Sequence, residues 1–405
     1  MLPSPGSVFV SNTRDIESFE HIVFLGVHNA ETFVSELSDW LPKLQFGDSA
    51  LVIADNASTD NTLEMLSNLA QKMRNPFAVL RNSRNYGGYG NLAVNLELFQ
   101  GAKWVTTLHQ DDTYSASHLA GHTKILVDAP ENLGMLASEA MSVNTQGKTV
   151  PYPRASWLLA QDADPVTIFL AHLKQHVFPF SGATFSKQAL LDFPIPWHST
   201  AFPDTELIMK MVADYRILLA PGVTVKYLEN PHSESHSINH KQRDLGAFQA
   251  LIRTFAHPNF AKICKAVGPQ EQGRFLTALK EGIEVRIHDP QIRALLVHTG
   301  LEMSAEHFGM SPQVADMLGP IYLQAEDFRA AEVLTNLSSN KGRKILHDVQ
   351  GLLPMPQIEN GSRRFLLYLL RLFPLRLRVR IIRSLMASST GKRAFSSWNF
   401  DWKNR

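Results

Sequence analysis

The sequence predicts an α/β fold in which the strands of a sheet end in polar, ligand-type residues, followed by a mainly α-helical C-terminal region. Three short apolar segments support the sheet: residues 50–54, 77–80 and 104–108. Each leads into a stretch that contains acidic, amide or glycine residues. In open α/β folds, ligands bind at the carboxyl ends of the strands. The three segments therefore predict one ligand site at the edge of the sheet.

The first of these strand ends carries Asp55, followed by the small polar residues 56–60. A carboxylate at the carboxyl edge of a buried strand is well placed to contact a ligand. Ser58, Thr59 or Asp60 can also cap the helix that follows, and most strand-to-helix junctions carry such residues for capping alone. The case for Asp55 as a ligand-binding residue therefore depends on the other two segments.

The second segment leads into a glycine-rich loop, residues 81–91, with Gly87, Gly88 and Gly90. Glycines let backbone N–H groups approach a phosphate closely, and the start of the following helix favours negative charge. A glycine-rich turn without a ligand explains this segment equally well when it is taken alone.

The third segment runs into His109, Gln110, Asp111 and Asp112. Adjacent side chains on an extended segment point in opposite directions, so we expect the two carboxylates not to form one clamp. One can reach a hard cation that also binds substrate phosphates, while the other faces a ribose or the acceptor. A lone Asp-Asp pair is usually a solvated turn, but three ligand-type strand ends together are harder to explain in that way.

These segments, in this order and spacing, resemble the inverting glycosyltransferases of family 2, which have the GT-A fold. The resemblance covers residues 20–240 and rests on residues 22–31, 55–60, 85–91, 110–112, 180–183 and 202–207. It implies a Rossmann-like, nucleotide-sugar-binding domain with a mixed, mostly parallel sheet at residues 1–240.

The resemblance also implies roles for single residues. The donor nucleotide is expected to contact Val27, Asn29, Glu31, Asp55, Asn85, Gly87, Gly90 and Asp111. Asp55 would accept the imide N–H of a uracil- or thymine-type base. Asp112 would bind the Mn²⁺ or Mg²⁺ ion that neutralises the departing diphosphate. A histidine usually completes this metal site, and we prefer His232, with His236 as the alternative.

On the acceptor side, the resemblance implies Asp204 as the general base, with Ser181, Gly182 and Glu206 nearby. Pro203 biases Phe202 away from helix, which predicts that Asp204 lies just inside the start of a helix. Acidic residues in a first turn also complement the helix dipole. Simple capping is therefore the alternative for Asp204 and, more strongly, for Glu206.

The implied function is metal-dependent transfer of a hexose from a nucleoside diphosphate sugar, with UDP preferred, to a glycan or lipid-linked acceptor, as in polysaccharide biosynthesis. His109 stands where the family often has an Asp, so a nucleotide-sugar-binding or scaffold module without turnover is the alternative. A weaker alternative is an NAD(P)-binding oxidoreductase, from the Gly88-x-Gly90-x-x-Ala93 pattern. Residues 81–87 separate that pattern from the preceding strand, which argues against it.

Length and composition suit a globular protein of 405 residues, for which we expect a helical region at 241–350 and a basic tail at 351–405. The single cysteine, Cys264, excludes an internal disulfide and indicates a reducing compartment. We find no secretory leader and no apolar stretch of the ~18 residues that a membrane span requires. These features favour a cytoplasmic location, with peripheral attachment to the inner face of the membrane left open.

The C-terminal tail differs in charge from the rest of the chain. Residues 341–405 contain 14 Lys or Arg and three acidic residues. Residues 362–383 are basic and amphipathic, and Pro374 interrupts their helical pattern. This segment suits an anionic membrane surface, but packing on its own protein or on a second subunit is slightly favoured. We expect no nucleic acid partner, because aromatic residues do not alternate with the arginines.

Overall fold

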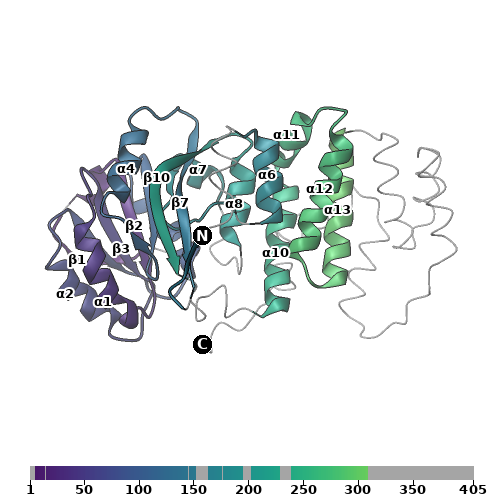
Figure 1. The fold of residues 1–405 in the computed structure, drawn as a ribbon. Coiled ribbons are helices and arrows are strands. Elements are labelled where there is room, and N and C mark those ends of the chain that lie inside the picture. The colour runs from purple at the N-terminus through teal and green to yellow at the C-terminus, as the bar shows by residue number, and fades with distance from the viewer. Residues whose placement is uncertain are drawn as a thin grey trace, which may run out of the picture. The chain divides into compact units, whose positions relative to one another are not determined.

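The computed structural model describes residues 5–13, 15–144, 146–151, 163–175, 177–194, 202–228 and 239–308. The chain divides into two compact units, one made of Met1–Thr254 and Glu281–Arg293, the other of Phe255–Lys280 and Ala294–Arg405. Figure 1 shows the sheet in the earlier residues and the helices α10 to α13 in the later ones.

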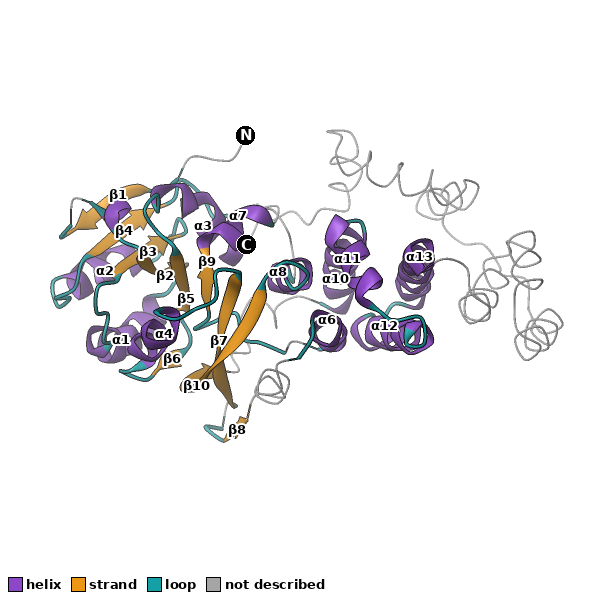
Figure 2. Ribbon diagram, turned by 90° about the horizontal axis from the view of Figure 1, so that it is seen from above, coloured by secondary structure: helices purple, strands orange, loops and turns teal. Residues whose placement is uncertain are grey.

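The first unit contains a mixed sheet, with the order β1-β4-β3-β2-β5-β9-β7-β10-β6 among the described residues and β8 paired to β7. The strands are β1 (Ser7–Ser11), β2 (His21–Val27), β3 (Ala50–Asp55), β4 (Phe77–Arg81), β5 (Trp104–His109), β6 (Thr113–Tyr114), β7 (Leu133–Val143), β8 (Thr149–Pro151), β9 (Thr184–Ser186) and β10 (Arg216–Leu228). The longer strands pair in parallel, as β4-β3-β2-β5 and as β7-β10. Short β9 lies antiparallel between β5 and β7 and joins the two groups (Figure 2).

Helices cover both faces of this sheet. Figure 2 shows α1 (Glu31–Trp40), α2 (Thr62–Ala70) and α4 (His118–Leu126) on one face, and α3 (Gly88–Asn95) and α7 (Lys187–Asp192) on the other. All six residues of β3 are buried. A parallel strand that is covered on both faces needs a continuous apolar sequence, which is why residues 50–54 lack polar alternation.

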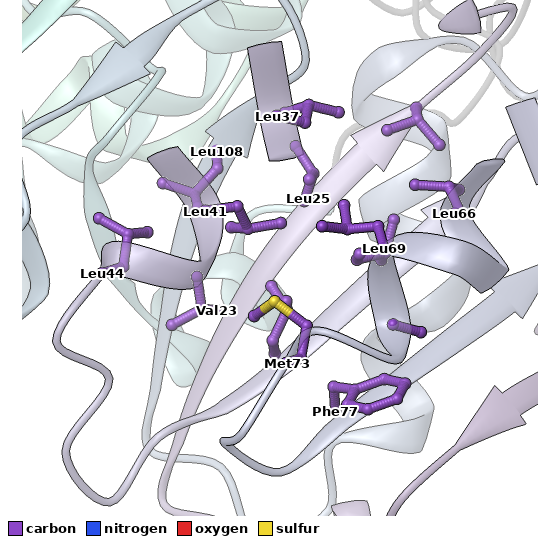
Figure 3. Packing of buried hydrophobic residues seen from close by; sticks show 14 of the residues in the cluster. Val23, Leu25, Leu37, Leu41, Leu44, Leu66, Leu69, Met73, Phe77 and Leu108 are labelled. Carbon is purple, nitrogen blue, oxygen red and sulfur yellow. The ribbon is translucent and has the colours of Figure 1, made fainter. Parts of the chain in front are cut away.

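The main apolar core lies between the sheet and the helices α1 and α2. Val23 and Leu25 of β2 pack there with Leu37 of α1 and Leu66 of α2, as Figure 3 shows. Each fully buried aliphatic side chain of this kind contributes about 1.5–3 kcal/mol. Trp104, Leu133, Leu136, Ala220 and Val223 form a second core beside β7 and β10.

Two further helices of the first unit, α6 (Pro165–Lys174) and α8 (Pro203–Met211), begin at proline. Proline suits the first helical position because its missing N–H has no partner there. Asp164 caps α6 by accepting from the N–H groups of Val166 and Thr167. The remaining one-turn 3₁₀ helices are η1 (Ile16–Ser18), η2 (Leu41–Lys43) and η3 (Leu96–Leu98).

The later residues form α10 (His240–Phe255), α11 (Pro258–Ala266), α12 (Gln272–Arg286) and α13 (Pro290–Phe308). Within the second unit, the rings of Phe255 and Phe260 lie 5.0 Å apart, and the Cys264 side chain is fully buried. A Cβ at Gly300 would lie 3.2 Å from the Phe255 ring, so glycine allows α13 to pack closely there. Among the helices that the structure describes, none has the length and apolar character to span a membrane.

The fold class expected from the sequence is confirmed, namely a mixed, mostly parallel α/β sheet followed by a helical C-terminal region. The predicted domain boundaries at residues 240 and 350 stay predictions. The basic tail, including residues 362–383, lies outside the described residues.

Candidate active site

The carboxyl ends of three central strands meet at one edge of the sheet. Val27, the last residue of β2, pairs with Asp55, the last residue of β3, and β5 lies on the other side of β2. Gln110, just beyond β5, holds both backbone polar groups of His28: its Oε1 accepts from the His28 N–H at 2.8 Å, and its Nε2 donates to the carbonyl at 3.3 Å. The loops after β2 and β5 are therefore fixed to each other.

The Asp55 side chain is fully buried at this edge. Its two oxygens accept from the backbone N–H of Ser58 at 3.2 and 3.3 Å, and Arg81 Nε lies 3.8 Å from Oδ2. Arg81 also donates to the carbonyl of Ser58. These contacts hold the carboxylate in one orientation at the position predicted for base recognition.

Asn29 and Glu31, two further predicted donor contacts, bind the loop that follows β3. Asn29 Oδ1 accepts from the N–H of Thr59 at 2.9 Å, and its own N–H donates to Ser58 Oγ. Glu31 Oε1 accepts from Asn61 Nδ2 at 2.9 Å. Both side chains are exposed, so each fixes a loop and also faces solvent.

The glycine-rich loop is held by asparagines. Asn56 donates to Asn85 Oδ1 at 2.8 Å and to the Gly87 carbonyl, and its own Oδ1 accepts from Asn82 and from the N–H of Tyr86. Behind the loop, Asn91 accepts from Asn82 and donates to the Ala54 carbonyl on β3. The loop that contains Asn85 and Gly87 is thus tied to the adjacent strand, and Gly90 is buried in the first turn of α3.

Left-handed backbone occurs in these loops and directly before α8. Among the described residues, Asn29, Ala57 and Phe202 are the non-glycine residues with positive φ, at 46°, 59° and 57°. Such conformations cost about 1–3 kcal/mol each and cluster at functional sites. Gly87, at φ 76°, adopts positive φ without that cost.

Beyond β5, His109, Asp111 and Asp112 bring one ligand atom each to within 4.8 Å of one another. One ligand atom of each carboxylate lies in this group, so the expectation that the two side chains point in opposite directions was wrong. It assumed an extended segment, but β5 ends at His109 and the chain turns at residues 110 and 111. The turn directs both carboxylates to the same side.

Asp112 is only 1% exposed, and burial raises its pKa to about 6. Nearby His109 lowers this pKa, Asp111 raises it, and the Ser181 hydroxyl and the Leu228 N–H lower it. Oδ1 accepts from the Leu228 N–H at 3.1 Å. Among the described residues, Oδ2 has no hydrogen-bond partner, and His109 Nδ1 lies 3.8 Å away. A buried carboxylate oxygen without a partner costs free energy unless a cation binds it.

Ser181 and Gly182 lie beside this carboxylate. The Ser181 hydroxyl is 2.5 Å from the hydroxyl of Tyr114, which accepts from the His109 N–H at 2.9 Å. Gly182 has a φ of 76°, and a Cβ there would lie 2.3 Å from Val225 Cγ2. Only glycine suits that position.

Asp204 lies in the first turn of α8 and is half-buried, which agrees with its predicted place just inside a helix. The start of α8 is held by Arg286, which contacts Thr205 Oγ1 at 3.4 Å and lies over the Phe202 ring. The structure therefore fixes the helix turn that carries the predicted base.

Glu206, predicted to lie on the acceptor side, is fully buried. Arg253 of α10 donates to both of its oxygens at 2.8–2.9 Å, and Lys210 pairs with it from one turn along α8. The ion pair with Arg253 links α8 to α10, so Glu206 has a structural role. The acceptor contact stays an untested prediction.

Residues 23–172 match the family model described as Glycosyl transferase family 2. This segment of the chain is therefore similar to glycosyltransferase family 2. This confirms the resemblance noted from the sequence, and the protein is a glycosyltransferase. No curated protein matches the chain.

Solved glycosyltransferases show a distant likeness. S. aureus TarS 1-349 in complex with UDP-GlcNAc is 17% identical, with 85% of this chain and 95% of that chain covered and a TM-score of 0.47. The mannosyltransferase PcManGT from Pyrobaculum calidifontis, in complex with GDP-Man and Mn²⁺, is 18% identical, with 82% and 84% covered and a TM-score of 0.43.

Sequence reasoning missed several residues that organise this site. Gln110 and Asn56 lay inside recognised segments, but their side-chain partners depend on loops that are distant in sequence. No sequence signal links Tyr114 to Ser181 or Leu228 to Asp112. His232 and His236 lie outside the described residues.

Proposed function

We propose that this enzyme transfers a hexose, with inversion, from a nucleoside diphosphate sugar to a hydroxyl of a glycan or lipid-linked acceptor, with UDP as the preferred nucleotide. One observation carries the proposal: Oδ2 of Asp112, buried and without a hydrogen-bond partner in the described part of the chain, lies in a group of potential metal ligands with Asp111 and His109. A nucleotide-sugar transferase of this family needs such a group for the diphosphate.

The residues present fit a divalent cation. Carboxylate oxygens suit Mg²⁺ and Mn²⁺, and an imidazole nitrogen suits Mn²⁺. Asp112 is the proposed ligand. The backbone N–H of Leu228 donates to it, and Leu228 precedes His232 by four residues in the sequence. This proximity in sequence supports His232 as a further ligand, with His236 as the alternative. A bound cation would neutralise the charge that develops on the departing diphosphate.

The proposed donor contacts follow the sheet edge. Asp55 is the acceptor for the imide N–H of the base, and Asp111 lies toward the ribose or sugar. The remaining donor contacts are Val27, Asn29, Glu31, Asn85, Gly87 and Gly90. The backbone strain at Asn29 and the fixed orientation of Asp55 support a preorganised site.

Asp204 is the proposed base. Its carboxylate would take the proton of the acceptor hydroxyl while the acceptor oxygen bonds to the anomeric carbon and the bond to the diphosphate breaks. Because Glu206 is fully buried and ion-paired, Asp204 is the first-turn carboxylate of α8 with the exposure for this task. Ser181 and Gly182 border the acceptor side. A cytoplasmic location, with residues 362–383 at an anionic membrane or a second subunit, completes the proposal.

Titration calorimetry of UDP into the protein, with Mn²⁺ and then with EDTA, tests the donor site. We expect binding that requires Mn²⁺ and is lost in Asp112→Ala, while exposed Asp128→Asn serves as the matched control. Asp204→Asn should bind UDP normally and lose transfer. Normal turnover by that variant would refute the assignment of the base, and binding without turnover in the wild type would favour a nucleotide-sugar-binding module.

A further inference from the structure

A chain of buried polar side chains crosses the sheet beneath α4 and ends at the turn beside Asp112. Its members are 8% exposed or less, and they are, in order, Ser49, His21, Thr106, Thr184, His122 and Ser138. Successive contacts measure 2.9, 2.7, 2.5, 2.6 and 2.8 Å. Ser138 then donates to the carbonyl of Gly182 at 2.9 Å.

This order follows the order of the strands in space. Ser49 immediately precedes β3, His21 begins β2, Thr106 lies on β5, Thr184 on β9 and Ser138 on β7. His122, from α4, bridges the last two strands. This series of hydrogen bonds therefore connects β3 and β2 to β9 and β7, the strands near the turn that contains Gly182.

With both imidazoles neutral, the terminal carbonyl determines the direction of every hydrogen bond, because a carbonyl can only accept. Ser138 must donate to Gly182, so it accepts from His122 Nε2–H, and His122 Nδ1 accepts from Thr184. By the same reasoning Thr184 accepts from Thr106, and Thr106 accepts from His21 Nε2–H. His21 Nδ1 is then left to accept from Ser49. Burial supports the neutral state, since it lowers the pKa of His21 to about 4 and that of His122 well below its usual value. Each neutral imidazole then carries its proton on Nε2.

A second donor reaches the same carbonyl. His118 Nε2 lies 2.9 Å from Gly182 O, and its Nδ1 is buried without a hydrogen-bond partner among the described residues. The Gly182 N–H donates to the Thr107 carbonyl at 2.7 Å. The Gly182 peptide is thus held on both sides. The preceding residue is Ser181, whose hydroxyl contacts that of Tyr114 and lowers the pKa of Asp112.

We propose that Ser138 and His118 are positioning residues, which fix the Gly182 carbonyl and thereby hold Ser181 in place against Asp112. The order of the contacts stands on geometry, their directions also use the neutral state of the histidines, and the effect on metal binding rests on the proposed function.

Histidine ¹⁵N spectra of the metal-free protein test the chain. From about pH 6 to about pH 8, His21, His118 and His122 should stay neutral with the proton on Nε2. A proton on Nδ1 of His21 or His122 would overturn the proposed chain.

Three variants then test positioning. Ser138→Ala and His118→Phe each remove a donor to Gly182, whereas Thr106→Val removes a buried hydroxyl of the same chain and leaves both donors. In metal-free spectra, the first two should shift the amide signals of Ser181 and Gly182 more than Thr106→Val does. Their Mn²⁺ affinity, measured by titration with Mn²⁺ alone, should fall about three- to tenfold, and that of Thr106→Val should change less than about twofold.

Equal changes in all three variants would show a merely structural role and overturn the proposal. If His118→Phe does not fold, Ser138→Ala carries the comparison. A wild-type protein that binds no Mn²⁺ would count against the proposed function, and the tautomers and amide shifts would still decide the positioning role.

Discussion

The backbone N–H of Leu228 donates to Oδ1 of Asp112 at 3.1 Å, across 116 residues of sequence. Leu228 ends β10, and β10 pairs with β6, the short strand that directly follows Asp112. Strand β10 therefore holds one oxygen of Asp112, the candidate metal ligand. The other oxygen has no hydrogen bond among the described residues.

Asp112→Asn should stabilise the metal-free protein at pH 7 while it abolishes Mn²⁺-dependent UDP binding. The folded-state pKa of about 6 exceeds the ordinary 3.8, so the stabilising effect of the protonated carboxyl is present below pH 3.8 and lost as pH rises through about 6. Removing the buried charge should raise the free energy of unfolding by about 2 kcal/mol at pH 7. Urea unfolding at pH 7 and near pH 4 measures this. An unchanged or lower stability at pH 7 would contradict it.

Acid should destabilise the protein through its buried histidines. Burial lowers the pKa of His21 and His118 from 6.5 to about 4, so their contribution is present above pH 6.5 and lost as pH falls toward about 4. Each should contribute about 2–3 kcal/mol, and Asp112 offsets part of this between pH 6 and 4. Urea midpoints across that range check the prediction. His118→Phe should flatten the profile, whereas replacing the exposed His240 by Gln should not.

Gly182→Ala should destabilise the protein by about 3 kcal/mol or more, because the added Cβ would lie 2.3 Å from Val225 Cγ2 and the backbone is left-handed. Gly147 has the same φ of 76° with nothing within 4 Å of a Cβ. Gly147→Ala should therefore cost only the backbone term, about 1 kcal/mol. Similar losses of unfolding free energy in the two variants would show that Val225 moves aside.

Glu206→Gln should cost about 3–5 kcal/mol, because it leaves the charges of Arg253 and Lys210 without their carboxylate in a buried site. The exposed pair Lys174 and Glu281, 4.0 Å apart, provides the control. Glu281→Gln should change the free energy of unfolding by less than about 1 kcal/mol. Chemical denaturation of both variants gives the comparison, and a mild effect of Glu206→Gln would mean that water reaches this pair.

Local patterns predicted the strand ends well. Mostly apolar runs that stop at Asp55, Arg81 and His109 are visible in sequence because a parallel strand covered on both faces needs largely apolar residues. The start of α8 was also predictable, since Pro203 restricts the residue before it and suits the first helical position.

Long-range pairing was not predictable in the same way. Three-residue β9 has too little pattern to show that it lies between β5 and β7. The relation of Asp111 to Asp112 was predicted wrongly because the end of β5, not residue order, decides where those side chains point. The glycine loop suggested backbone contacts to a phosphate, whereas the partners of Asn56 and Asn82 depend on loops that the sequence does not bring together.

The place of β10 also bears on how the protein is made. Contacts that join distant residues form late, because the intervening chain must first lose its freedom. A growing chain cannot supply the Leu228 N–H until more than a hundred residues after Asp112 have been synthesised. Asp112 should therefore reach its buried environment only after β10 joins the sheet, so the candidate metal ligand is set late in folding and not at its start.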